Sequence, residues 1–196
     1  MAQRFRLGQS EVEYDVAYRN IRYPRLEFKS GNLLLVLPRG YTDESDLLRR
    51  HGKWIKTRGE QIQIALEKSR EIQPEPEKSI ADFKDCAIGL VETLQKTRSA
   101  QVNHVLFRRM NSKWGSYSSR GNLTLNTLLR FLPDRLVRYV IFHELSHSVA
   151  KRHNRKFWKV VSREFPDHNK LEDELLVHWF SVQRVMKQRP LSEDGD

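Results

Sequence analysis

The stretch Phe142-His143-Glu144-Leu145-Ser146-His147, followed six residues later by His153, organises this chain of 196 residues. It reads H-E-x-x-H-x5-H. On a helix, His143 and His147 stand four residues apart, so both imidazoles project from one face about one turn apart. That separation allows two imidazole nitrogens to reach one Zn²⁺ at about 2.0–2.1 Å. The motif therefore predicts a metal site on a helix.

Glu144 and His153 indicate what kind of metal site this is. With His153 as a third ligand, the fourth position is left for water, which is the arrangement of catalytic zinc sites. Glu144 would lie beside the metal, where it can take a proton from water and pass it to a leaving amine. We therefore predict Zn²⁺ as the cofactor and Glu144 as the catalytic base. The alternative is a buried helix whose histidines are hydrogen-bonded core residues.

The cysteine count and the hydropathy favour a cytoplasmic protein. A single cysteine, Cys86, excludes an intramolecular disulfide and fits a reducing compartment. Its helical surroundings predict that Cys86 is a small buried residue. No apolar run approaches 18 residues, which predicts no membrane span. The first residues also lack the apolar segment of a signal peptide.

The net charge of +10 indicates anionic partners, with nucleic acid first among them. No zinc-finger, helix-turn-helix or RNA-binding pattern accompanies this charge. DNA contact through a basic surface is therefore a prediction from charge alone. The sequence does not indicate an oligomeric state.

Proline and charge patterns divide the chain. Residues 1–72 are predicted to form an N-terminal β-rich appendage and a helix, with a small antiparallel sheet of about three strands between 12 and 38. Residues 73–78, with two prolines, form the predicted linker. The domain that carries the chemistry is expected at 79–190, and the acidic tail 191–196 is predicted to be disordered.

Within residues 79–190, helices and strands are predicted to be mixed. An amphipathic helix over 79–99 precedes strands at 102–107 and 123–126, and the motif helix opens at Pro133-Asp134 with Asp134 as its cap. Trp114-Gly115 lies between the strands. These two residues are either substrate-binding or a core aromatic beside a bulge glycine. A hairpin here could present an open edge to an extended peptide.

At these residues the chain resembles the YgjP-like metallopeptidases, relatives of the WLM and SprT-like zinc peptidases. The resemblance spans residues 109–165, with a looser match over the N-terminal strands. Four blocks carry it in order: Arg109-Met110-Asn111-Ser112-Lys113-Trp114-Gly115-Ser116, Leu123-Thr124-Leu125-Asn126, Tyr139 to His147, and His153-Asn154-Arg155-Lys156-Phe157-Trp158. It implies a zincin-like α+β fold, with a small antiparallel sheet packed against helices and the HExxH motif on a central helix. It also implies zinc held by His143, His147 and His153, with Glu144 as base.

Two related site types remain as alternatives for the third ligand. The spacing equals that of metzincins, H-E-x-x-H-x-x-G-x-x-H, but Ala150 replaces the glycine that permits a positive-φ turn, which argues against a metzincin. A gluzincin would use a downstream carboxylate in place of His153, and Glu172 or Glu174 could serve. Both also fit exposed helix carboxylates, and His153 is favoured.

The predicted function is zinc-dependent hydrolysis of peptide bonds in a protein or peptide substrate. Because the WLM and SprT-like relatives act on proteins attached to DNA, nucleic-acid-associated proteins are the predicted targets. Oxyanion stabilisation needs a further donor, and four residues are candidates: Arg109, Lys113, His168 and His178. The rival hypothesis is a non-catalytic, zinc-stabilised module that binds nucleic acid.

Overall fold

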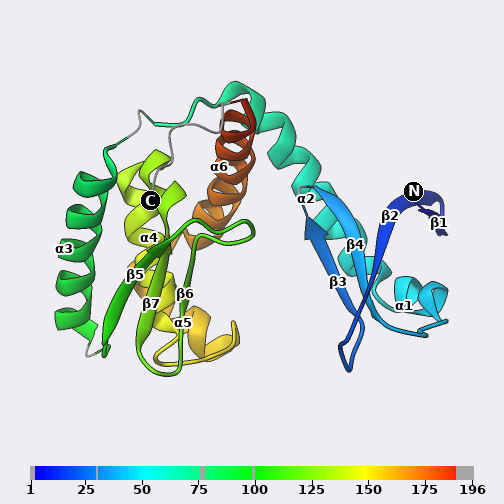
Figure 1. The fold of residues 1–196 in the computed structure, drawn as a ribbon, viewed down its shortest axis with the longest axis horizontal. Coiled ribbons are helices and arrows are strands. Elements are labelled where there is room, and N and C mark those ends of the chain that lie inside the picture. The colour runs from blue at the N-terminus through cyan, green and yellow to red at the C-terminus, as the bar shows by residue number, and fades with distance from the viewer. Residues whose placement is uncertain (1–2, 30, 76–77, 99, 189–196) are drawn as a thin grey trace. The chain divides into compact units, whose positions relative to one another are not determined.

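The computed structural model describes residues 3–29, 31–75, 78–98 and 100–188, and the chain divides into two compact units, Met1–Lys68 and Ser69–Asp196 (Figure 1). Part of the predicted linker and all of the predicted tail lie outside the described residues, so the predicted domain boundaries stay a prediction. Among the described helices, none is long and apolar enough to cross a membrane.

The first unit is built on a four-stranded sheet. Its strands are β1 (Gln3–Leu7), β2 (Ser10–Arg19), β3 (Arg25–Lys29) and β4 (Asn32–Pro38), in the order β1-β2-β4-β3. The apolar face of β4 packs with helix α1 (Glu44–Arg50) through Leu35, Leu37 and Leu48, none of which is exposed to solvent. Helix α2 (Gly52–Glu71) follows, and the boundary between the two units falls within it.

The pairing in this sheet differs from the predicted antiparallel arrangement of about three strands. β1 pairs with β2 and β3 with β4 in antiparallel fashion, but β2 and β4 are parallel. The parallel pair arises because β3 lies at the outer edge, so β4 returns between β3 and β2. β1 was missed because its two apolar residues, Phe5 and Leu7, stand among charged neighbours.

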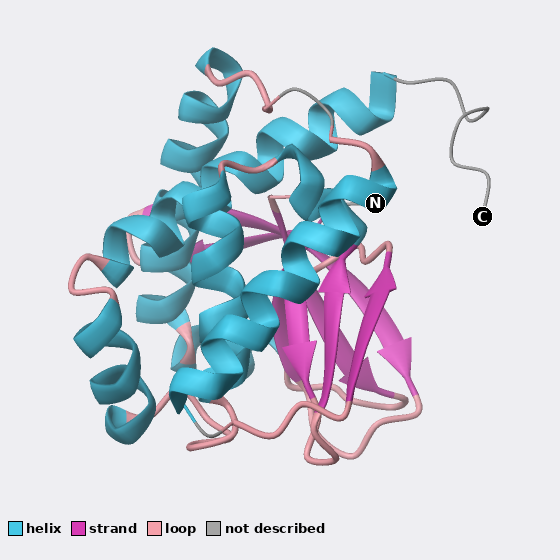
Figure 2. Cartoon of the chain, turned by 90° about the vertical axis from the view of Figure 1, so that its left-hand side faces the viewer, coloured by secondary structure: helices cyan, strands magenta, loops and turns pink. Residues whose placement is uncertain are grey.

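The second unit combines a three-stranded sheet with helices (Figure 1). The chain therefore mixes helices and strands (Figure 2), which confirms the α+β prediction. Strand β5 runs parallel to β7, and β6 is antiparallel to β7, so this sheet is also mixed and β6 is an edge strand. The elements in order are α3 (Ile80–Arg98), β5 (His104–Arg108), β6 (Gly115–Tyr117), β7 (Asn122–Asn126), the 3-10 turn η1 (Thr127–Phe131), α4 (Asp134–Ser146), α5 (Arg155–Glu164) and α6 (His168–Gln188).

Helix α4 is the centre of the second unit. It contacts α3, α5, α6, β6 and β7, so it is surrounded on most sides. Its apolar residues Leu136, Tyr139, Ile141 and Phe142 are fully buried. This core fixes the helix that carries His143 and Glu144.

Two details of the helices differ from the predictions. The side chain of Asp134 makes no capping hydrogen bond, and Pro133 occupies the N-cap position of α4. Asp134 instead forms an ion pair with Lys78. Cys86 is exposed on α3, so the prediction that it is buried was wrong. It lies outside the stripe of Phe83, Ala87 and Val91 that α3 packs into the core.

Candidate metal centre

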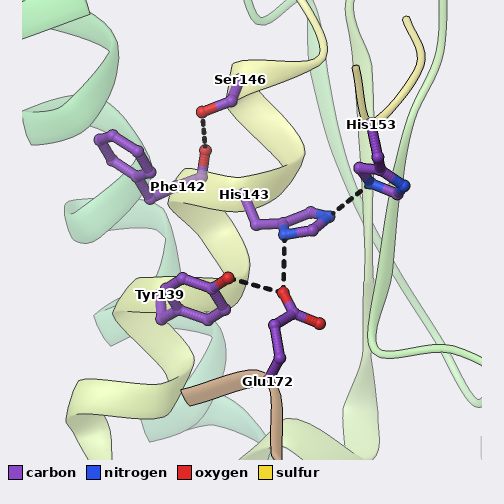
Figure 3. Close-up of polar contacts among 6 residues, drawn as sticks. All are labelled: Tyr139, Phe142, His143, Ser146, His153 and Glu172. Carbon is purple, nitrogen blue, oxygen red and sulfur yellow. Dashed lines mark hydrogen bonds and ion pairs between the residues drawn. The ribbon is translucent and has the colours of Figure 1, made fainter. Parts of the chain in front are cut away.

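Three histidines converge at the C-terminal end of α4. His143 lies in the helix, His147 is its C-cap residue, and the turn that follows brings His153 back toward both. Potential ligand atoms of the three imidazoles all lie within 4.8 Å of one another, and Nε2 of His143 is 2.9 Å from Nε2 of His153 (Figure 3). Within the described part of the chain, this is the cluster of histidine, cysteine or carboxylate groups that could hold a metal ion.

The chain reversal after α4 is built from local hydrogen bonds. Backbone N–H groups of His147 and Ser148 donate to the carbonyls of Glu144 and Leu145, which tightens the last turn. Asn154 then caps α5, because its side-chain oxygen accepts hydrogen bonds from the N–H groups of Lys156 and Phe157 at 3.0 and 3.1 Å. His153 therefore lies directly before a fixed helix start.

In two of the imidazoles, Nδ1 lies within hydrogen-bond distance of an oxygen acceptor. His143 Nδ1 lies 3.1 Å from Oε1 of Glu172 on α6, and His147 Nδ1 lies 3.1 Å from the carbonyl oxygen of Ala150. When Nδ1–H donates to such an acceptor, Nε2 keeps its lone pair free for a metal. The donor set thus fits a divalent ion bound through Nε2 atoms.

An aromatic ring packs against all three imidazoles. Phe157 is fully buried, and its ring centroid lies 4.9, 4.7 and 4.6 Å from those of His143, His147 and His153. Trp158 also stacks on His153, at 5.6 Å between centroids. In the sequence, both aromatics belong to the block from His153 to Trp158 that carries the family resemblance, but their spacing carries no sign of contact with the histidines.

The surroundings of His147 and His153 favour the neutral imidazole, which is the form that binds metal. Burial lowers the pKa of His147, and the neighbouring His143 lowers it further against the opposing effect of the Ala150 carbonyl. Desolvation likewise lowers the pKa of His153, together with the charges of His143 and His147.

The carboxylate of Glu144 is held against strand β6. Gly115 in β6 is buried, and a Cβ built on it would stand 2.8 Å from Cγ and 3.1 Å from Oε1 of Glu144. Burial raises the pKa of Glu144, while His143, Lys113 and a hydrogen bond from the backbone N–H of Tyr117 act in the opposite direction. A carboxylate with a raised pKa can hold a proton for transfer.

Trp114 and Gly115, the two predicted substrate-binding residues, lie in different surroundings. Gly115 lines the cleft in front of the histidines and contacts Glu144. The half-buried indole of Trp114 instead faces α6, where its N–H donates to the carbonyl of Leu175 at 3.3 Å and its ring meets Trp179 edge-on at 4.9 Å. Trp114 does not line the cleft.

The cleft has a volume of about 790 Å³ and places only one of the four oxyanion candidates near Glu144. That residue is Lys113. His168 borders a separate hollow with Trp158, His178 is buried near Glu174 and Arg135, and Arg109 is not part of the lining. The lining residues are Gln101, Lys113, Gly115, Ser116, Tyr117, Ser118, Ser119, His143, Glu144, His147, Ser148, Lys151 and His153.

The two alternative carboxylate ligands lie outside the histidine cluster. Glu172 contacts Nδ1 of His143, on the far side of that ring from the Nε2 that faces His153. Burial acts to raise the pKa of Glu172, but hydrogen bonds from His143 and Tyr139 outweigh it and hold the pKa below its usual range. Glu174 forms an ion pair with Arg135 at 2.5 Å.

Comparisons with known proteins give the family to which this chain is similar. The family model described as the YgjP-like metallopeptidase domain matches residues 81–178. The crystal structure of the metallopeptidase zymogen abylysin of Pyrococcus abyssi is 24% identical, with a TM-score of 0.43, and covers 47% of this chain and 93% of that chain. The zymogen of Methanocaldococcus jannaschii jannalysin is 25% identical, with a TM-score of 0.38, and covers 58% and 100%. A comparison with curated proteins found no match.

Proposed function

Because the chain belongs to the YgjP-like metallopeptidase domain family, we propose that it hydrolyses peptide bonds at a zinc ion held by His143, His147 and His153, with Glu144 as general base. The observation that carries this proposal is the convergence of three imidazoles beside a half-buried carboxylate in one cleft. Three nitrogen ligands with an open fourth position suit catalytic zinc. When bound, zinc lowers the pKa of water and polarises the scissile carbonyl.

Glu144 performs the proton transfers of the proposed reaction. Its carboxylate accepts a proton from the attacking water as the bond to the carbonyl carbon forms, and later gives that proton to the leaving amine. Gly115 and the backbone N–H of Tyr117 hold the carboxylate in place. The raised pKa matches this double role, because the same group must both take up and release the proton near neutral pH.

Lys113 is the proposed source of positive charge for the developing oxyanion. It lines the cleft, and its charge acts on Glu144. A cation in such a position stabilises negative charge that forms on the carbonyl oxygen in the transition state.

The edge strand β6 offers a place for the substrate. Ser116 and Tyr117 of β6 line the cleft, and among the described strands β6 pairs with β7 on one side only. An extended peptide could add to this edge through main-chain hydrogen bonds, which would place a scissile bond across the cleft. The substrate class is therefore a protein or peptide segment in extended conformation.

The proposal is tested by Glu144→Gln. This variant keeps the size of the side chain but removes the base, so we expect about one zinc per chain by mass spectrometry, as in the wild type, and loss of hydrolysis of an unfolded protein substrate. The control is His147→Ala, which should lose zinc and activity together. Activity in Glu144→Gln equal to that of the wild type would remove the base from the proposal.

Action on nucleic-acid-associated proteins is proposed from the resemblance to the WLM and SprT-like peptidases together with the net charge of +10. If phosphate contacts contribute, binding to a DNA duplex should weaken steeply as salt increases. Salt-independent or absent binding would leave peptide hydrolysis in place and remove DNA from the proposal.

A further inference from the structure

One carboxylate from α6 joins two residues of α4 that lie four positions apart. Oε1 of Glu172 accepts a hydrogen bond from the phenol of Tyr139 at 2.6 Å and lies 3.1 Å from Nδ1 of His143 (Figure 3). Tyr139 and His143 share a face of α4 because they stand at i and i+4. A single oxygen atom therefore meets both side chains.

We propose that Glu172 is a positioning residue, which with Tyr139 holds the His143 imidazole in the tautomer and orientation that present Nε2 to the metal. This inference rests on the proposed zinc site. In this inference Glu172 contacts the ligand His143 and does not bind the metal itself, whereas the sequence had suggested Glu172 as a possible direct ligand.

The hydrogen-bond chemistry allows only one arrangement around Oε1. An ionised carboxylate is an acceptor, so both Tyr139 Oη and His143 Nδ1 must donate to it. A neutral imidazole that donates from Nδ1 carries its lone pair on Nε2. Nε2 of His143 is the atom that faces His153, at 2.9 Å.

The burial of Tyr139 gives the contact its rigidity. Tyr139 is fully buried, so its hydroxyl cannot turn to bulk solvent, and a buried hydroxyl without a partner is unfavourable. Leu171 and Leu175 on α6 are also buried and flank Glu172 in the sequence, which fixes the helix that presents the carboxylate. The acceptor is thus anchored from both helices.

A direct ligand role for Glu172 would require a different arrangement. The carboxylate lies at Nδ1 of His143, whereas the atoms that cluster belong to the three histidines. Glu172 would have to leave both Tyr139 and His143 to reach that cluster. If Glu172 bound the metal, its substitution would remove one ligand. If Glu172 only positions His143, its substitution leaves the number of ligands unchanged.

The decisive experiment measures zinc affinity of the full chain by competition with a chromogenic chelator. We expect Glu172→Ala to bind zinc about 10–100-fold more weakly than the wild type, as is common when an outer partner of a ligating histidine is lost. Tyr139→Phe, which keeps the ring and Glu172, should show a smaller loss in the same direction. The matched control is Glu174→Gln, on the same helix but paired with Arg135, which should leave affinity unchanged.

Cobalt substitution separates the remaining outcomes. If Glu172 positions His143, the visible spectrum of the cobalt-loaded Glu172→Ala variant keeps the coordination number of the wild type. A change in coordination number would make Glu172 a ligand, and unchanged zinc affinity in both variants would remove its positioning role. Failure of the wild type to bind zinc would instead overturn the proposed metal site itself, and with it this inference.

Discussion

Gly115 lies so close to Glu144 that a methyl group on its Cα would stand 2.8 Å from Cγ of the glutamate. Real Cβ contacts are not this short, so Gly115→Ala must displace the Glu144 side chain. Because a shift of about 1 Å in a reacting group can lower the rate by about 100-fold, we expect kcat to fall by about that factor with zinc content unchanged. Steady-state kinetics and metal analysis check both parts.

The control for this substitution is Gly89→Ala on α3, where an added Cβ meets nothing within 4 Å. Alanine is the better helix former, so this variant should gain about 0.5–1 kcal/mol in stability with no effect on kcat. If Gly115→Ala kept full activity, the contact with Glu144 would have no role in positioning the base.

Asn154→Ala should weaken the segment that carries His153. The substitution removes the acceptor for the first N–H groups of α5, which lowers stability by about 1 kcal/mol. Zinc affinity should fall as well, because His153 and Phe157 lie on either side of the cap. Asn154→Ser, which can still cap the helix, should retain most of both properties, and equal losses in the two variants would contradict the capping explanation.

Trp114→Phe distinguishes a structural role of this residue from contact with substrate. The substitution removes the N–H that donates to the carbonyl of Leu175, so we expect thermal unfolding to show a loss of about 1–2 kcal/mol. The KM for an extended peptide should stay at the wild-type value. A raised KM with unchanged stability would instead place the indole in contact with the substrate.

His178 should make the second unit sensitive to acid. Burial lowers the pKa of His178; Glu174 opposes this shift and Arg135 adds to it. The unfolded chain, with a histidine pKa of about 6.5, therefore takes up this proton first as pH falls. The contribution of His178 to the free energy of unfolding is therefore complete above a pH of about 6.5. As the pH falls below this value, the contribution is lost progressively, until the pH reaches the lower pKa of His178 in the folded state.

Removal of this histidine should reduce that loss. We expect His178→Leu, in the metal-free protein, to show a smaller fall in free energy of unfolding than the wild type between pH 7.5 and about 5. The comparison is made by denaturant titration at each pH, so that titration of His147 and His153 contributes equally to both proteins. Parallel pH curves would mean that His178 has no such effect.

The sequence predicted the parts of the site that depend on local spacing. His143 and His147 follow from one helical turn, and the alternation of Leu123 and Leu125 indicated β7 correctly. Contacts between segments that are distant in the sequence leave no regular spacing of residues from which they could be predicted. The contact between His143 and Glu172 joins residues on two helices, and the one between Gly115 and Glu144 joins a strand to a helix. From the sequence, Glu172 was either a possible ligand or an exposed helix carboxylate, and Gly115 was either a substrate contact or a bulge glycine.

The exposed position of Cys86 illustrates the same limit on a smaller scale. An amphipathic helix over 79–99 was predicted, and Phe83, Ala87 and Val91 form its buried stripe in the structure. The one-residue step from Ala87 back to Cys86 turns about 100° around the helix. The preference of cysteine for buried positions gave the wrong answer because helix geometry outweighs it there.

The hydrogen bond from His147 Nδ1 to the carbonyl of Ala150 has a consequence for how this segment can evolve. The acceptor belongs to the backbone, and every amino acid supplies the same carbonyl. Exchange of the side chain at position 150 therefore leaves the acceptor in place as long as the turn keeps its path. Insertion or deletion of a single residue between His147 and His153 would move the carbonyl away, so we expect a change in the length of this loop to disturb the contact more than a substitution at position 150.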